Sequence, residues 1–191
     1  MAERCPTPPN PNVIRDFVLA LLCALVFLMG MAGLLVVAFG AEPAPTKVFT
    51  AKPERIPDGD TVVYPGNRVC RLMGIDAPEV AHGGKHTGQP LGAQALAGLQ
   101  GELVRGPNTV LVYGTDKYGR MLCVILDDDG YMANLFMVES GLAATYLTER
   151  APFKHGLEEA EKRAKQDRRG IWNLPNYESP SKYRQRVKAR E

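Results

Sequence analysis

Residues 58–79 read DGDTVVYPGNRVCRLMGIDAPE, and this stretch determines how the rest of the chain is interpreted. Two strand-like runs, 61–64 and 68–75, are joined by a Pro-Gly-Asn turn, which predicts a β-hairpin. The acidic side chains at the outer ends of the hairpin are Asp58, Asp60, Asp76 and Glu79. Because folding brings both outer ends together, we expect these carboxylates to converge.

Arg71 lies within the second run, so a guanidinium group is expected beside the carboxylates. Several carboxylates around a fixed guanidinium suit a site that holds a hard cation and a phosphate. The alternative is an ordinary hairpin whose Asp-Gly and Asp-Ala-Pro-Glu ends are only turns. The hairpin by itself leaves both interpretations open.

The composition allows one domain with appendages, because the chain has 191 residues. Its formal net charge of +2 gives no indication of nucleic-acid binding, but the charge is unevenly distributed. Within residues 182–191, five cations stand against the single acid Glu191: Lys182, Arg184, Arg186, Lys188 and Arg190. This basic C-terminal tail (177–191) either binds phosphates or is a solvated, disordered end.

The N-terminal part contains a long uncharged run, residues 17–41, after a Pro- and Asn-rich arm (1–16) that we expect to be disordered. At about 1.5 Å per residue, a helix over this run exceeds the roughly 30 Å hydrocarbon core of a bilayer. A cleaved signal peptide is the alternative, since residues 38–40 form a small-x-small site. The run is longer than the usual apolar region of a signal peptide, which favours an uncleaved transmembrane anchor followed by a linker (42–47).

The remaining elements predict a small α+β domain over residues 48–176. We expect a strand over 47–56, which Pro53 interrupts. The further expected elements are a helix over 91–105, strands over 109–113 and 121–126, a helix over 132–140 and a helix over 157–168. Short strands with turn residues between them fit a partly open five-stranded barrel with about three helices, preceded by the one transmembrane helix.

Five segments in order identify a family resemblance: DGDT at 58–61, RLMGIDAPE at 71–79, DKYGR at 116–120, SGLA at 140–143 and AEKRAKQDRRGIW at 160–172. Over about residues 48–173 the chain resembles the staphylococcal nuclease (thermonuclease) family. The resemblance implies an OB-fold barrel with three helices. It also implies a calcium-dependent phosphodiesterase that cuts DNA and RNA.

The resemblance assigns roles to individual positions. The implied calcium ligands are the carboxylates of Asp60 and Asp76 and the backbone carbonyl of Ala77, with Asp58 nearby. The implied catalytic residues are Arg71 and Arg120, which bind phosphate, and Glu79 as general base. The residues implied to lie near the nucleotide are Lys117, Tyr118 and Tyr146. An all-oxygen ligand set also selects a hard cation such as Ca²⁺ on chemical grounds.

Some residues depart from the family pattern or allow another interpretation. Pro57 replaces an apolar residue and removes one ladder hydrogen bond. His82 and His86 could suggest zinc, but they lie in a Gly-rich loop without a third ligand. Cys70 and Cys123 form no C-x-x-C pattern. Strand parity places both on the face opposite the arginines, as core neighbours, and leaves a disulfide open.

Two other functions remain as alternatives: a catalytically inactive module of the same fold that binds nucleic acid or protein, and a membrane-tethered adaptor. The joint presence of the carboxylates and arginines favours catalysis. Because calcium is scarce in the cytosol, we expect a single-pass membrane protein with its nuclease domain outside the cytoplasm. Secretion after signal cleavage is the alternative location.

Overall fold

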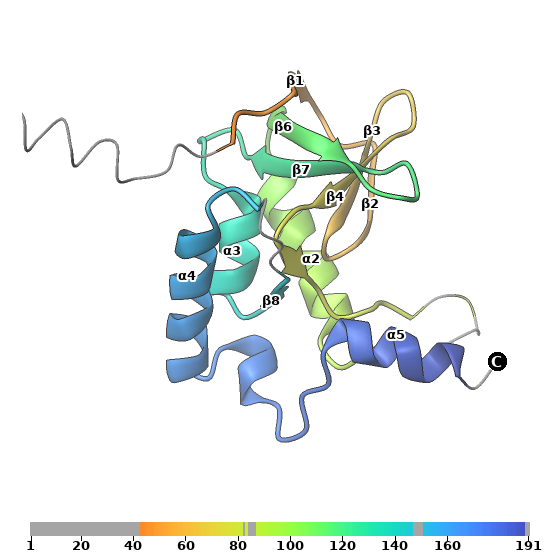
Figure 1. The fold of residues 1–191 in the computed structure, drawn as a ribbon, viewed down its shortest axis with the longest axis vertical. Helices are drawn as coiled ribbons and strands as arrows, with labels where there is room; N and C mark the ends of the chain where they lie inside the picture. Colours follow the sequence, from red (N-terminus) through yellow and green to blue (C-terminus); the bar gives the residue numbers. More distant parts are fainter. Residues whose placement is uncertain (1–42, 82, 84–86, 147–150, 190–191) are drawn as a thin grey trace, which may run out of the picture. The chain divides into compact units, whose positions relative to one another are not determined.

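The computed structural model of this protein describes residues 43–81, 83, 87–146 and 151–189. These residues belong to one compact unit, Glu42–Glu191 (Figure 1). The predicted arm, the predicted membrane anchor and the histidine pair His82 and His86 lie outside the described residues. Among the helices that are described, none combines the length and the hydrophobicity that crossing a bilayer requires.

Strands and helices follow one another along the unit, which confirms the α+β class. The strands are β1 (Lys47–Ala51), β2 (Arg55–Asp58), β3 (Thr61–Tyr64), β4 (Arg68–Leu72), β5 (Ile75–Asp76), β6 (Asn108–Thr115), β7 (Met121–Leu126) and β8 (Ala144–Thr145). The helices are α2 (Gly92–Leu103), α3 (Ala133–Glu139), α4 (Lys154–Gln166), a short 3₁₀ helix η1 (Gly170–Asn173) and α5 (Pro180–Lys188).

The main sheet has six strands in the order β1-β6-β7-β4-β3-β2. It is mixed, because β4 pairs with β7 in parallel whereas the other neighbours are antiparallel. The two short strands β5 and β8 form a second, antiparallel pair. The predicted hairpin is present as β3 and β4, joined by the turn at residues 65–67.

The predicted five-stranded barrel needs correction, because the described sheet has six strands and two ends. The run 47–56 was expected to form one strand. It forms two instead, and Pro53 lies in the break between them. β1 pairs with β6 at one end of the sheet, and β2 pairs with β3 at the other. Pro57 lies in β2, an edge strand of the sheet, where the register shifts between Arg55 and Asp58. Proline lacks an N–H, and an edge strand or a bulge is where a strand tolerates this loss.

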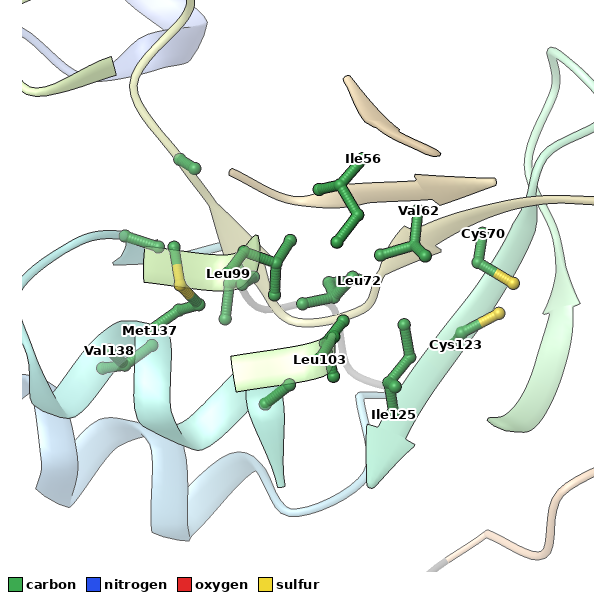
Figure 2. Packing of buried hydrophobic residues seen from close by; sticks show 14 of the residues in the cluster. Ile56, Val62, Cys70, Leu72, Leu99, Leu103, Cys123, Ile125, Met137 and Val138 are labelled. Carbon is green, nitrogen blue, oxygen red and sulfur yellow. The ribbon is translucent and has the colours of Figure 1, made fainter. Parts of the chain in front are cut away.

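The core lies between the sheet and the helices α2 and α3 (Figure 2). Helix α2 contributes Leu99 and Leu103 at a spacing of one helical turn, and both side chains are fully buried. The hairpin contributes Val62 and Leu72 to the same cluster. One face of the hairpin therefore holds the core, and the opposite face is left for polar side chains.

Cys70 and Cys123 lie together in this core as free thiols (Figure 2). A hydrogen bond with Cys70, together with burial, raises the pKa of the Cys123 thiol. The parity prediction is confirmed, because both cysteines are buried whereas Arg71 lines a cleft on the opposite face.

Residues 177–191 were expected to be a tail, but α5 forms within them. Ser179 precedes the helix and Pro180 occupies its first turn, a sequence that favours a helix start. Pro180 and Tyr183 are buried against the domain. The described residues thus contain four α-helices rather than about three.

Candidate active site

The first wall of the site is built by the hairpin. Asp60 follows β2 and precedes β3, and its side chain is only 10% exposed. Its Oδ2 accepts a hydrogen bond of 2.8 Å from the Ala77 N–H, and its Oδ1 accepts one of 3.2 Å from the Thr61 hydroxyl. Gly59 is required here, because an added Cβ would lie 2.8 Å from the Cβ atoms of Ala77 and Ala95.

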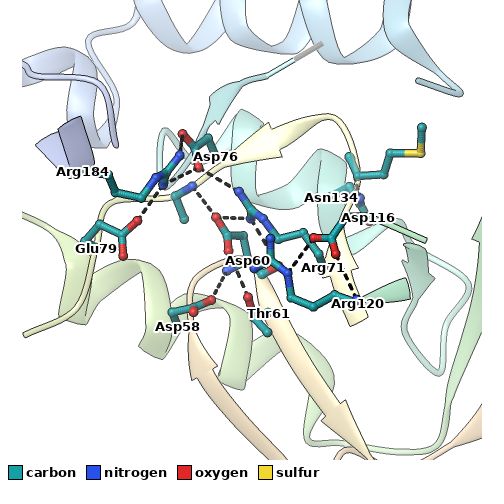
Figure 3. Close-up of polar contacts among 12 residues, drawn as sticks. Asp58, Asp60, Thr61, Arg71, Asp76, Glu79, Asp116, Arg120, Asn134 and Arg184 are labelled. Atoms are coloured by element: carbon teal, nitrogen blue, oxygen red, sulfur yellow. Dashed lines mark hydrogen bonds and ion pairs between the residues drawn. The ribbon is translucent and has the colours of Figure 1, made fainter. Parts of the chain in front are cut away.

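Arg71 joins the two central carboxylates (Figure 3). Its Nη1 forms an ion pair with Asp60 Oδ2, and its Nη2 donates to Asp76 Oδ1 at 2.8 Å. Burial lowers the pKa of the Arg71 guanidinium, and the nearby carboxylates of Asp76 and Asp58 oppose that effect. The arginine is therefore held in a defined orientation by two acids from different elements.

Asp76 is placed by the turn between β4 and β5. Gly74 in this turn has φ +81°, a conformation that favours glycine. The fully buried side chain of Asn134 on α3 fixes the same turn, since its Nδ2 donates to Met73 O at 2.9 Å. Its Oδ1 accepts from the Ile125 N–H on β7 at 3.1 Å. One amide side chain thus connects the helix layer, the sheet and the segment that carries Asp76.

Glu79 lies just beyond β5 and is held through its backbone. Its N–H donates to Gln89 Oε1 at 3.1 Å, and its carbonyl accepts from the Gln89 N–H at 2.8 Å. Gly92 allows this close approach, because a Cβ there would come within 2.3 Å of the Glu79 carbonyl oxygen. The sequence pattern did not predict a role for Gln89, which lies between the Gly-rich segment and the start of α2.

Arg120 reaches the cleft from the turn between β6 and β7. Asp116 organises this turn: its Oδ1 accepts the N–H groups of Tyr118 at 2.8 Å and Arg120 at 3.0 Å. Its Oδ2 pairs with Arg120 Nε at 2.8 Å. Burial raises the pKa of Asp116, but the hydrogen bonds from Arg120 and Tyr118 outweigh burial and lower it overall. Asp116 lies in the DKYGR segment, so the motif contained a signal for it.

The second wall is α5, which sequence reasoning did not place at the site. Arg184 donates to both oxygens of Asp76, at 3.1 Å and 3.0 Å, and to Glu79 Oε1 at 2.6 Å (Figure 3). Burial lowers the pKa of Arg184, whereas the hydrogen bonds to these two acids raise it, and they prevail. The basic composition of the tail was visible in the sequence. The sequence did not show that this segment contacts residues more than 100 positions earlier.

A single cleft of about 840 Å³ contains nearly all the predicted site residues. The predicted residues that line it are Asp58, Asp60, Arg71, Ala77, Glu79, Lys117, Tyr118, Arg120 and Tyr146. Asp76 joins them through its bonds to Arg71 and Arg184. Tyr118 and Tyr146 are 73% and 57% exposed, so both rings are accessible from solvent. The individual roles of these residues stay predictions.

The predicted donors at this cleft are the carboxylates of Asp60 and Asp76 and the carbonyl of Ala77. All are oxygens, which fits a hard divalent cation. Asp60 and Asp76 are buried carboxylates, and buried charges require compensation. In the structure this compensation comes from guanidinium groups on the same oxygens. Among the described residues, three acids close enough to share an ion occur at Asp127, Asp128 and Asp129, which form an exposed turn distant from the predicted ligands in sequence. That turn matches none of the predicted ligands.

Comparison with known proteins agrees with this geometry. The model of the family described as staphylococcal nuclease homologue matches residues 69–174. A protein of Shigella flexneri named micrococcal nuclease is 33% identical over 151 residues, which cover 73% of this chain and 83% of that protein. The probable endonuclease LCL3 of Colletotrichum graminicola is 33% identical over 150 residues, 72% of this chain and 53% of that protein. Endonuclease YhcR of Bacillus subtilis is 29% identical over 164 residues, 76% of this chain and 14% of that protein.

The chain belongs to the staphylococcal nuclease homologue family. Its relatives are named as nucleases and endonucleases, which supports a hydrolase that acts on nucleic acids. The chain spans most of the Shigella protein but only about half of the Colletotrichum protein, and a small part of the Bacillus protein.

Proposed function

We propose that this protein is a calcium-dependent nuclease that hydrolyses phosphodiester bonds of DNA, RNA or both. The observation that carries the proposal is the convergence of two buried carboxylates, two arginines and Glu79 on one cleft. A binding module has no need of this combination. The position and charge of each group in the cleft indicate whether it would hold the cation, bind phosphate or accept a proton.

Asp60, Asp76 and the Ala77 carbonyl are the groups that would hold the cation. When bound, a divalent cation supplies charge neutralisation at phosphate and lowers the pKa of a coordinated water. All the donors are oxygens, which suits calcium better than zinc.

Arg71 and Arg120 supply planar donors for the non-bridging phosphate oxygens, where negative charge builds during hydrolysis. Arg120 is bound to Asp116 through Nε. Among the described residues, none forms a hydrogen bond or ion pair with its Nη atoms. Glu79, whose side chain is 25% exposed, lines the same cleft and would accept a proton from an attacking water.

The test is cleavage by the full-length protein, kept in detergent because of residues 17–41. Single-stranded DNA, duplex DNA and RNA are incubated with the protein in calcium or in an excess of chelator, and products are resolved by electrophoresis. We expect cleavage with calcium and none with chelator. Binding without cleavage in calcium would establish the inactive module instead. Cleavage that persists in chelator would contradict the calcium assignment.

The proposal also includes a membrane tether at residues 17–41, with the nuclease domain outside the cytoplasm. It is supported by the uncharged run in the sequence and by the calcium-type donor set. Protease added to intact cells or spheroplasts should remove the domain from the membrane. Protection of the domain until the membrane is permeabilised would contradict this orientation. A mature chain that begins near residue 41 would show signal cleavage.

A further inference from the structure

Arg184 forms ion pairs with two acids of the proposed reaction, Asp76 and Glu79. Its guanidinium group contacts both oxygens of Asp76, a proposed cation ligand, and Oε1 of Glu79, the proposed base. The side chain comes from α5, an element outside the residues matched by the family model.

Both oxygens of Asp76 accept hydrogen bonds from arginines. Oδ1 accepts from Arg71 at 2.8 Å and from Arg184 at 3.1 Å, and Oδ2 accepts from Arg184 at 3.0 Å. A divalent cation next to Asp76 would lie close to two positive groups, and that repulsion is strong in a partly buried site. Binding of a cation to Asp76 therefore requires one arginine to withdraw.

Arg184 is the arginine that can withdraw at lower cost. Its side chain is 46% exposed, whereas that of Arg71 is 13% exposed. Arg71 also pairs with Asp60, and removing it would leave a buried carboxylate without its partner. Asp76 keeps its bond to Arg71 when Arg184 withdraws, and the arriving cation would take over the compensation of this buried carboxylate.

The released side chain would remain inside the cleft. Four residues of α5 line the cleft: Ser181, Arg184, Gln185 and Lys188. Their spacing of three and four places them on one face of the helix. A nucleic-acid phosphate in the cleft would then meet Arg184 and Lys188 on this wall.

We propose that Arg184 is a third phosphate-binding arginine that is held on Asp76 and Glu79 until a divalent cation displaces it. The proposal rests on the proposed calcium-dependent nuclease function. It makes the binding of cation and nucleic acid cooperative, since each ligand favours the released position of Arg184. Release also removes the guanidinium group from Oε1 of Glu79.

The test is a calcium titration by isothermal calorimetry on the full-length protein in detergent, without nucleic acid. Arg184→Met keeps the aliphatic stem and removes the competing charge, so it should bind calcium on the order of tenfold more tightly than the wild type. Lys182→Met is the matched control, because it removes one charge from the same helix at an exposed position that does not line the cleft. Its calcium affinity should stay within about twofold of the wild type, as for a remote surface charge.

A second titration adds a phosphorothioate oligonucleotide that resists cleavage. The wild type should then bind calcium more tightly than it does alone, and the gain should be smaller in Arg184→Met. Circular dichroism checks that Arg184→Met is folded. If it is not, Arg184→Lys replaces it, because lysine retains the charge but loses the two-point contact. Its calcium affinity should exceed that of the wild type by a smaller factor than is expected for Arg184→Met.

Equal calcium affinity in wild type and Arg184→Met would overturn the inference. Weaker binding in the variant would also overturn it, since Arg184 would then be positioning Asp76. The same gain in Lys182→Met would reduce the effect to general charge and overturn the inference as well. If wild type and variants all bind no calcium, the calcium assignment of the proposed function fails together with the inference.

Discussion

One wall of the cleft, the strand wall, runs from the end of β2 through β4 and β5 to Glu79, and another, the helix wall, comes from α5; the turn between β6 and β7 also lines the cleft. In the strand wall, Asp60 is fixed by a backbone N–H and Arg71 by two carboxylates, and both side chains are nearly buried. In the helix wall, Arg184 is half exposed and reaches the site only through its guanidinium group. The difference separates two tasks: the strand wall holds a geometry, whereas the helix wall can change its contacts when ligands arrive.

The attachment of α5 supports this view. Besides Pro180 and Tyr183, the helix is held by contacts with Glu178, which lies just before it. Gln89 Nε2 donates to the Glu178 carbonyl at 2.8 Å, and Arg186 pairs with the Glu178 carboxylate at 2.7 Å. Exposed ion pairs contribute little to stability. Substitutions in the two walls should therefore differ in kind as well as in size.

Arg71→Lys tests the strand wall and should have the largest effect. Lysine keeps the charge but loses the planar fork that contacts two oxygens. We expect kcat to fall on the order of 10²–10³-fold, about 3–4 kcal/mol, by analogy with the loss of an oxyanion donor. Steady-state kinetics in saturating calcium measures the effect.

Arg68→Lys is the matched control, since Arg68 lies on the same strand but binds the Pro65 carbonyl and stacks on Phe49. Its kcat should be close to that of the wild type. Near-normal turnover in Arg71→Lys would remove the two-point contact from the mechanism.

Asn134→Ala tests how firmly the strand wall is supported. The substitution leaves the Met73 carbonyl and the Ile125 N–H without this partner in the core. We expect the free energy of unfolding to fall by about 2–4 kcal/mol, because unsatisfied buried groups are costly. Urea denaturation followed by circular dichroism measures it. Asn173→Ala, at an exposed position, should change stability by less than about 0.5 kcal/mol.

An equal and small change in both asparagine variants would mean that the Asp76 turn does not depend on the amide of Asn134. The strand wall would then be no better supported than the helix wall. The exposure of the side chains would then be the remaining difference between the two walls.

The two walls also differ in how well the sequence predicts them. Asp60, Arg71, Asp76 and Glu79 lie within one hairpin segment, so turn chemistry and strand alternation bring them together through short-range pairing. Arg184 lies 108 positions after Asp76, and no local pattern determines which surface a helix will contact. The single strand expected over 47–56 was wrong for a related reason: the run forms two strands, with Pro53 between them, and these pair at opposite ends of the sheet.

Asp116→Asn tests the loop that carries Arg120, and a smaller effect is expected. Asparagine retains an oxygen for the two backbone N–H groups but loses the charge that orients Arg120 Nε. We expect kcat/KM to fall about tenfold, or about 1.4 kcal/mol. Asp127→Asn is the matched control, because Asp127 Oδ1 accepts the N–H groups two and four residues later in the same way. Equal losses in both variants would indicate a general effect of the turn.

The smallest effect concerns the number of phosphates that the helix wall contacts. The composition of the tail alone predicted that deleting residues 182–191 weakens nucleic-acid binding and flattens its salt dependence, with each of five cations able to contribute. In the structure, Lys188 lines the cleft, whereas Arg186 is paired with Glu178 and Lys182 does not line the cleft. Only the residues on the cleft face should therefore release counterions when nucleic acid binds.

Lys188→Met should lower the slope of log affinity against log salt by about 0.9 on duplex DNA, the value for one phosphate contact. Arg186→Met and Lys182→Met should leave the slope unchanged, since their charges lie outside the cleft. Fluorescence anisotropy over a salt series measures all three variants with the same labelled duplex, in the Arg71→Lys background to slow cleavage. Similar slope changes in the three variants would mean that the tail acts as a diffuse positive charge. The helix wall would then have no preferred face, and its contrast with the strand wall would be one of charge rather than of geometry.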